Sequence, residues 1–206
     1  SRGLRSLGPV WSRPNIFGHG VPFAYPRSPD TGPGLTDAGK ALVKACNELG
    51  IMVDAAHLNE RGFWDLVAIS TAPIVATHAC AHAICPATRN LTDRQLDAVK
   101  ASGGVVGFNF SVSEVRPDGH RDPDIPVETV VAHLGYLVER MGDDHVALGS
   151  DFDGATMPHP LRDASQLQNL IQALRAHGFL AERAAQQHRH RARAQQRRHA
   201  QVDQQR

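Results

Sequence analysis

Ile51-Met-Val-Asp-Ala-Ala-His57 is a short apolar run that ends in a histidine, and Pro73-Ile-Val-Ala-Thr-His78 repeats that pattern. A third apolar run, residues 146–150, leads directly into the carboxylate of Asp151. Strands buried on both faces of a parallel sheet read as continuous apolar runs of this kind. In barrel enzymes the catalytic side chains follow the carboxyl ends of such strands. The three runs therefore predict one site, with two imidazoles and a carboxylate, at one end of a parallel sheet.

Strand-like and helix-like segments alternate along the chain. The apolar runs predict strands near residues 4–10, 51–55, 74–77, 105–110 and 146–150. Helical spacing and capping residues predict helices at 36–49, 60–70, 92–102, 126–141 and 163–177, and a polar loop covers 112–124. Strict alternation indicates an α/β fold with a parallel sheet and helical crossovers. Periodicity alone fits an open doubly wound sheet and part of a closed barrel equally well.

The composition changes abruptly near residue 180. Seven arginines against one aspartate give residues 183–206 a charge of +6, so residues 1–182 carry −5 of the total of +1. Basic runs bind phosphate backbones non-specifically, but this one has no aromatic residue on which bases could stack. We expect no specific nucleic-acid partner. We divide the chain into a barrel domain at 1–180 and a basic low-complexity tail at 181–206, which we expect to be disordered or translated in the wrong reading frame.

Several other classes of protein are disfavoured. The three cysteines, Cys46, Cys80 and Cys85, form neither a dense disulfide framework nor a Cys-x-x-Cys zinc motif. No apolar run approaches the roughly 18 residues that a membrane span needs. The first residues contain no signal-peptide core. We therefore expect a cytoplasmic protein without a membrane span.

Five ordered strings give the chain a specific resemblance to a known family. They are Gly34-Leu-Thr-Asp-Ala-Gly-Lys40, the two histidine runs extended to 47–57 and 72–78, Cys85-Pro-Ala-Thr-Arg-Asn-Leu-Thr-Asp93 and Gly149-Ser-Asp-Phe-Asp-Gly154. Together they resemble the membrane (renal-type) dipeptidases of peptidase family M19, in a bacterial branch, over roughly residues 3–179. The resemblance implies a zinc-dependent hydrolase of dipeptides. It also favours a partial (β/α)8 barrel of the TIM type, as in metal-dependent hydrolases, over the open sheet.

The resemblance implies roles for four residues. His57 and His78 match the two histidines that hold one of the two zinc ions in the family. Arg89 matches the arginine that receives the terminal carboxylate of the substrate, and a guanidinium fork suits a carboxylate. Asp151 matches the aspartate that transfers protons around the attacking water and the substrate amine. A dipeptide is the implied partner, and a homodimer is left open.

The departures from the family pattern are equally specific. A His-x-Asp pair and a bridging Glu complete the metal site in the family, and we expect them upstream of the matched region. Trp11 stands where the family often has a histidine that steadies the oxyanion, and His19, although near, is not assigned that role. We therefore expect an N-terminally truncated fragment that binds at most one zinc ion, weakly.

Two alternatives stay open at this point. One is a catalytically inactive barrel remnant that has the ancestry of the family without its metal site. The other is a different amidohydrolase-type metal hydrolase such as a deaminase, against which the Arg89-Asn90 string argues.

Overall fold

The computed structural model describes residues 3–179, so the predicted tail lies outside the described residues. It contains five short parallel strands: β1 (Ser6–Leu7), β2 (Met52–Val53), β3 (Val75–Ala79), β4 (Val105–Phe108) and β5 (Val146–Leu148). β1 pairs with β2, and β3, β4 and β5 pair in that order. A parallel bridge between Asp54 and Val75 joins the two groups. The strands therefore lie side by side in chain order.

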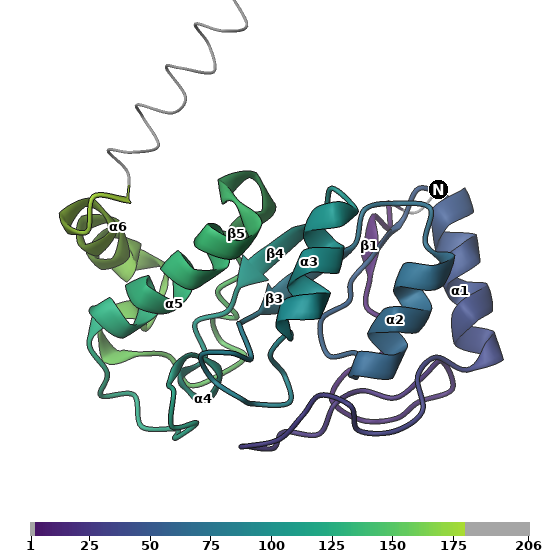
Figure 1. The fold of residues 1–206 in the computed structure, drawn as a ribbon, viewed down its shortest axis with the longest axis horizontal. Coiled ribbons are helices and arrows are strands. Elements are labelled where there is room, and N and C mark those ends of the chain that lie inside the picture. Colours follow the sequence, from purple (N-terminus) through teal and green to yellow (C-terminus); the bar gives the residue numbers. More distant parts are fainter. Residues whose placement is uncertain (1–2, 180–206) are drawn as a thin grey trace, which may run out of the picture.

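Helices follow the strands and pack beside one another in the same sequence order (Figure 1). They are α1 (Asp37–Glu48), α2 (Glu60–Ile69), α3 (Asp93–Ala101), the single turn α4 (Val112–Val115), α5 (Val127–Met141) and α6 (Leu167–Ala176). A doubly wound sheet reverses its strand order at a switch point, whereas a barrel does not. The unreversed order from β1 to β5 confirms the partial barrel over the open sheet.

The core lies between the strands and the surrounding helices. Its largest fully buried apolar side chains come from both layers: Phe63, Leu66, Leu96, Phe108, Phe110, Leu137 and Met141. Each such side chain stabilises the fold by about 1.5–3 kcal/mol when it leaves water. Among residues 3–179 no helix is both long and apolar enough to cross a bilayer.

Most strand boundaries differ by one to three residues from those predicted, and three larger differences have a structural cause. The strand predicted at 4–10 is only β1, because Pro9 has no amide hydrogen with which to extend the pairing. The predicted loop 112–124 begins with α4, since Val112 and Val115 are fully buried and draw the chain into a helical turn. The last helix starts at Leu167, after a 3₁₀ turn at Ala164–Gln166.

A buried histidine of α5 holds two neighbouring segments in place, the loop after β3 and the end of α4. His133 Nε2 accepts a hydrogen bond from the amide of Ala81 (2.9 Å), and Nδ1 donates to the carbonyl of Val115 (3.1 Å). Because Nε2 accepts from an N–H, the imidazole must be neutral. Burial lowers the pKa of His133 to about 4. The loop after β3 and the end of α4 are thus tied to one neutral side chain.

The lowered pKa of His133 predicts a loss of stability in acid. The folded pKa of about 4 lies below the unfolded value near 6.5, so the unfolded chain binds the extra proton between these limits. The stabilisation is complete above about pH 6.5 and falls by about 2–3 kcal/mol as the pH approaches 4. We expect the melting temperature of His133→Gln to depend less on pH over this interval than that of the wild type. Parallel melting profiles for the two proteins would contradict this.

Candidate metal and substrate site

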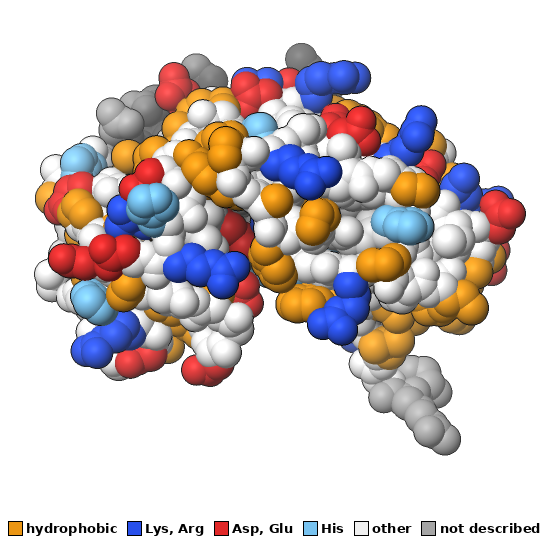
Figure 2. Space-filling view, turned by 90° about the horizontal axis from the view of Figure 1, so that it is seen from below, with side chains coloured by type: hydrophobic (Ala, Val, Ile, Leu, Met, Phe, Trp, Pro, Cys, Tyr) orange, Lys and Arg blue, Asp and Glu red, His pale blue; other side chains and the backbone are white. Residues whose placement is uncertain are grey.

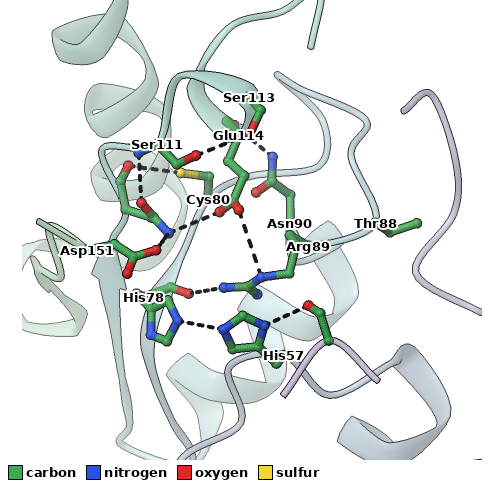
Figure 3. A network of polar contacts seen from close by, with 12 residues as sticks. His57, His78, Cys80, Thr88, Arg89, Asn90, Ser111, Ser113, Glu114 and Asp151 are labelled. Carbon is green, nitrogen blue, oxygen red and sulfur yellow. Dashed lines mark hydrogen bonds and ion pairs between the residues drawn. The ribbon is translucent and has the colours of Figure 1, made fainter. Parts of the chain in front are cut away.

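His78 owes its direction to an irregularity in β3. From Ala76 to Ala79 the β3 chain advances by three residues, whereas the paired part of β4 advances by only two. This extra residue is a β-bulge, a feature that often redirects a side chain beside an active site. The bulge includes His78, whose ring lies at the end of the strand that faces the loops (Figure 3).

Two glycines make room for the bulge. A Cβ added to Gly107 of β4, or to Gly149 after β5, would lie 1.9 Å from the carbonyl oxygen of Thr77. No side chain fits at that distance, so close approach of the backbone requires glycine at both positions.

A chain of hydrogen bonds fixes the protonation of His78. The Thr77 hydroxyl donates to the carboxylate of Asp54 (2.5 Å), which can only accept. Its oxygen therefore accepts from His78 Nδ1, at 2.8 Å. With the proton on Nδ1, the Nε2 atom of His78 carries the lone pair, which can accept a hydrogen bond or bind a metal ion.

His57 faces His78 from the loop after β2. The two Nε2 atoms are 2.9 Å apart, and His57 Nδ1 lies 2.8 Å from the hydroxyl of Ser12 (Figure 3). Because His78 Nε2 can only accept, His57 Nε2 donates to it and His57 Nδ1 accepts from the hydroxyl of Ser12. A hydroxyl can also accept, so Ser12 would equally support the other tautomer of His57 when a metal ion takes its Nε2 lone pair. Burial, followed by the nearby charge of Arg89, lowers the pKa of His57 to about 3 and also lowers the pKa of His78. Both rings are therefore neutral near pH 7.

The two imidazoles fit a zinc ion as part of its ligand set. Nitrogen ligands lie about 2.0–2.1 Å from zinc, which places two of them about 3.3 Å apart in a tetrahedral site. The Nε2 atoms at 2.9 Å need to separate by only a few tenths of an ångström. Within residues 3–179 no group of three or more His, Cys, Asp or Glu side chains is placed to hold a metal ion. In the described part of the chain the two imidazoles could therefore make up only part of a ligand set.

Arg89 lies beside the histidines, buried to 4% exposure. One terminal nitrogen donates to the carbonyl of His78 (3.1 Å), and Nε is 3.8 Å from a carboxylate oxygen of Glu114. Nε itself has no hydrogen-bond partner. The guanidinium is therefore held in place while part of its donor capacity stays free.

Asp151 follows β5 and lies at the same end of the sheet. It lines a cavity of about 560 Å³ together with His57 and Glu114, within the range of small-ligand sites. A smaller cavity, of about 190 Å³, adjoins Arg89 and shares Glu114 as a wall. Figure 2 shows that this side of the molecule is hollowed by a cleft with acidic side chains in its wall.

The structure thus brings the four predicted residues to one end of the sheet. His57 and His78 are in direct contact, Arg89 contacts the main chain of His78, and Asp151 reaches the cavity beside them. The sequence reasoning missed five further residues of the site: Ser12, Asp54, Thr77, Asn109 and Glu114. Asp54 could have been found from its place at the end of an apolar run.

Comparison with known proteins decides the family. The model of the membrane dipeptidases (peptidase family M19) matches residues 1–187. The chain belongs to this family. A solved structure, a metallo peptidase from Rhodobacter sphaeroides liganded with a phosphinate mimic of the dipeptide L-Ala-D-Ala, is 58% identical, with a TM-score of 0.85 over 86% of this chain.

Two curated relatives agree with this assignment. An uncharacterized protein from the pqqA 5′ region of Klebsiella pneumoniae is 55% identical over 86% of this chain, and the dipeptidase tcpJ of Claviceps purpurea is 35% identical over 72%. The chain spans 65% and 35% of these two proteins, and 50% of the Rhodobacter chain. It therefore corresponds to part of the length of each M19 relative.

Proposed function

We propose that the protein acts as a zinc-dependent dipeptidase. The observation that carries the proposal is the facing pair of neutral imidazoles, His57 and His78, with Arg89 beside them. Membership of the M19 family agrees with it. Neutral histidine with its lone pair on Nε2, the tautomer of His78 in this structure, is the form that binds a metal.

Each residue has a distinct part in this proposal. His57 and His78 would hold zinc, which when bound acts as a Lewis acid and lowers the pKa of a coordinated water. The guanidinium of Arg89, which lines the smaller cavity, would bind the terminal carboxylate of the substrate. Asp151, which lines the same cavity as His57, would accept and return a proton near the scissile bond and the substrate amine.

The substrate class follows from the positive charge of Arg89 and from the small volume of the cavities beside it. Arg89 selects a free carboxylate, and the adjoining cavities of about 560 and 190 Å³ suit a short peptide. The Rhodobacter relative, 58% identical, was solved with a mimic of L-Ala-D-Ala. Dipeptides are therefore the proposed substrates.

We further propose that the 206-residue chain is part of a longer gene product, since it spans 50% of the Rhodobacter chain. A metal-exchange assay on that full-length gene product tests the proposed function. The protein is freed of metal with a chelator, and hydrolysis of L-Ala-L-Ala and L-Ala-D-Ala is followed by release of free alanine while zinc is added back. We expect no hydrolysis without metal and saturable recovery with zinc. Unchanged hydrolysis in chelator, or none after zinc is restored, would contradict the proposal.

The 206-residue chain provides a second expected outcome. Two imidazoles supply half of a four-ligand zinc site. We expect this chain alone to bind zinc far more weakly than the full-length gene product in calorimetric titrations, and to show no hydrolysis above background. An inactive remnant would instead give weak zinc binding in both proteins. Strong zinc-dependent hydrolysis by the 206-residue chain would show that it holds further ligands.

The remaining expectations concern the cellular location and the oligomeric state of the protein. We include in the proposal a cytoplasmic location and leave a homodimer open. Cell fractionation and light scattering of the purified protein test these two points.

A further inference from the structure

Glu114 is a buried carboxylate for which the proposed mechanism has no role. It belongs to α4 and is only 5% exposed. One of its oxygens lies 3.8 Å from Arg89 Nε, and the other accepts a hydrogen bond from Asn109 Nδ2 at 3.1 Å. Burial raises the pKa of Glu114, the charge of Arg89 lowers it and that of Asp151 raises it. A buried acid is costly unless it is paired, so its position calls for an explanation.

Asn109 connects Glu114 to the catalytic side of the cavity. Its Nδ2 group donates both to Glu114 and to Asp151, each at 3.1 Å. The orientation of the amide is determined, because its oxygen accepts from the amide of Ser111 at 2.7 Å. Asn109 is fully buried, which excludes water as a competitor for these contacts.

The main chain reinforces this connection. Asn90, the residue after Arg89, donates through Nδ2 to the carbonyl of Glu114 at 2.8 Å. The segment that carries the arginine is therefore joined to α4 both by this bond and by the ion pair between Arg89 and Glu114 (Figure 3). A movement of α4 would displace Arg89.

We propose that Glu114 and Asn109 form one positioning unit, which sets Arg89 relative to Asp151 and so matches the site to the two ends of a dipeptide. The inference rests on the proposed function, in which Arg89 binds the carboxylate end and Asp151 serves the amine end. Glu114 orients the guanidinium of Arg89. Asn109 fixes Asp151 relative to Glu114, because its Nδ2 group donates a hydrogen bond to both carboxylates.

The geometry predicts how a neutral substitute behaves. In Glu114→Gln the amide oxygen keeps the hydrogen bond from Asn109, so the NH₂ group faces Arg89 Nε. Two donors then oppose each other and the guanidinium turns away. We expect KM for L-Ala-D-Ala to rise about 10- to 100-fold, the usual effect of losing a residue that orients a binding side chain without touching the ligand. We expect kcat to change less than about threefold. Asn109→Ala, which frees Asp151, is expected to lower kcat instead.

The test uses the full-length gene product loaded with zinc, after the wild type has been shown to hydrolyse the dipeptide. Failure at that first step would refute the proposed function, whereas the following comparisons address the positioning unit alone. With the carboxamide L-Ala-D-Ala-NH₂, which has no charged end for Arg89, Glu114→Gln is expected to leave kcat/KM within about twofold of the wild type. Calorimetric binding of the phosphinate mimic is expected to weaken by the same factor as KM rises. Glu128→Gln, which makes the same chemical change at an exposed position of α5 that lines neither cavity, is the matched control and is expected to change neither.

A double variant decides the case even if Glu114→Gln folds poorly. Arg89→Met combined with Glu114→Gln removes both buried charges together, so no unpaired charge remains. If Glu114 acts through Arg89, the double variant has the same KM as Arg89→Met alone, within about twofold. A further rise in KM in the double variant, or an equal loss on the dipeptide and on its carboxamide, would overturn the inference.

Discussion

Replacing His78 with alanine should abolish dipeptide hydrolysis by the full-length gene product. The variant loses one of the two facing imidazoles that are proposed to hold zinc. Thr77→Val should be milder, because it removes only the hydroxyl that holds the tautomer of His78. Loss of such an outer partner costs about 10- to 100-fold in metal affinity or activity, and His78→Ala should exceed that range.

The measurements are initial rates with L-Ala-D-Ala and zinc content by metal analysis. His159, an exposed residue of the 3₁₀ turn His159–Leu161, provides the matched control, and its alanine variant should keep wild-type rates. Wild-type turnover in His78→Ala would show that the metal is held elsewhere.

Arg89→Lys should raise KM for dipeptides strongly and change kcat little. Lysine keeps the positive charge opposite Glu114 but loses the planar fork that binds a carboxylate through two donors. The lost charged hydrogen bond amounts to about 1.5–3 kcal/mol, or roughly a 10- to 150-fold rise in KM. Lysine is preferred to alanine here because alanine would leave the buried Glu114 without its cation.

Steady-state kinetics on a dipeptide and its carboxamide check this prediction. The carboxamide lacks the charge that Arg89 is proposed to bind, so its kcat/KM should be nearly the same in both proteins. A fall in kcat alone, with KM unchanged, would assign Arg89 to a chemical step instead of binding.

The sequence could predict those parts of the fold and site that depend on local pattern. Apolar runs ending in His57, His78 and Asp151 located the strands and their shared end, because alternation and burial leave a signal within a few residues. Their strand order needed the family resemblance, since periodicity does not distinguish a barrel from an open sheet. The structure supplied that order independently.

The missed residues depend on contacts between distant segments. Asn109 and Asp151 are 42 positions apart, and no spacing rule relates them. Glu114 lies among polar residues that predicted a loop, yet the burial of Val112 and Val115 carries it inside. The bulge in β3 was equally hidden, because it is defined by pairing with β4 and not by the residues of β3 themselves.

Three non-glycine residues at the site have a left-handed backbone: His57, Asp151 and Asp153, with φ of 69°, 61° and 65°. Each costs of order 1 kcal/mol or more relative to a relaxed conformation. The surrounding fold must therefore oppose a local tendency of these segments to relax. Mutations that weaken the distant core would first release the segments that carry His57 and Asp151. Heating should accordingly inactivate this protein before it unfolds, so that thermal inactivation and loss of secondary structure become separate events.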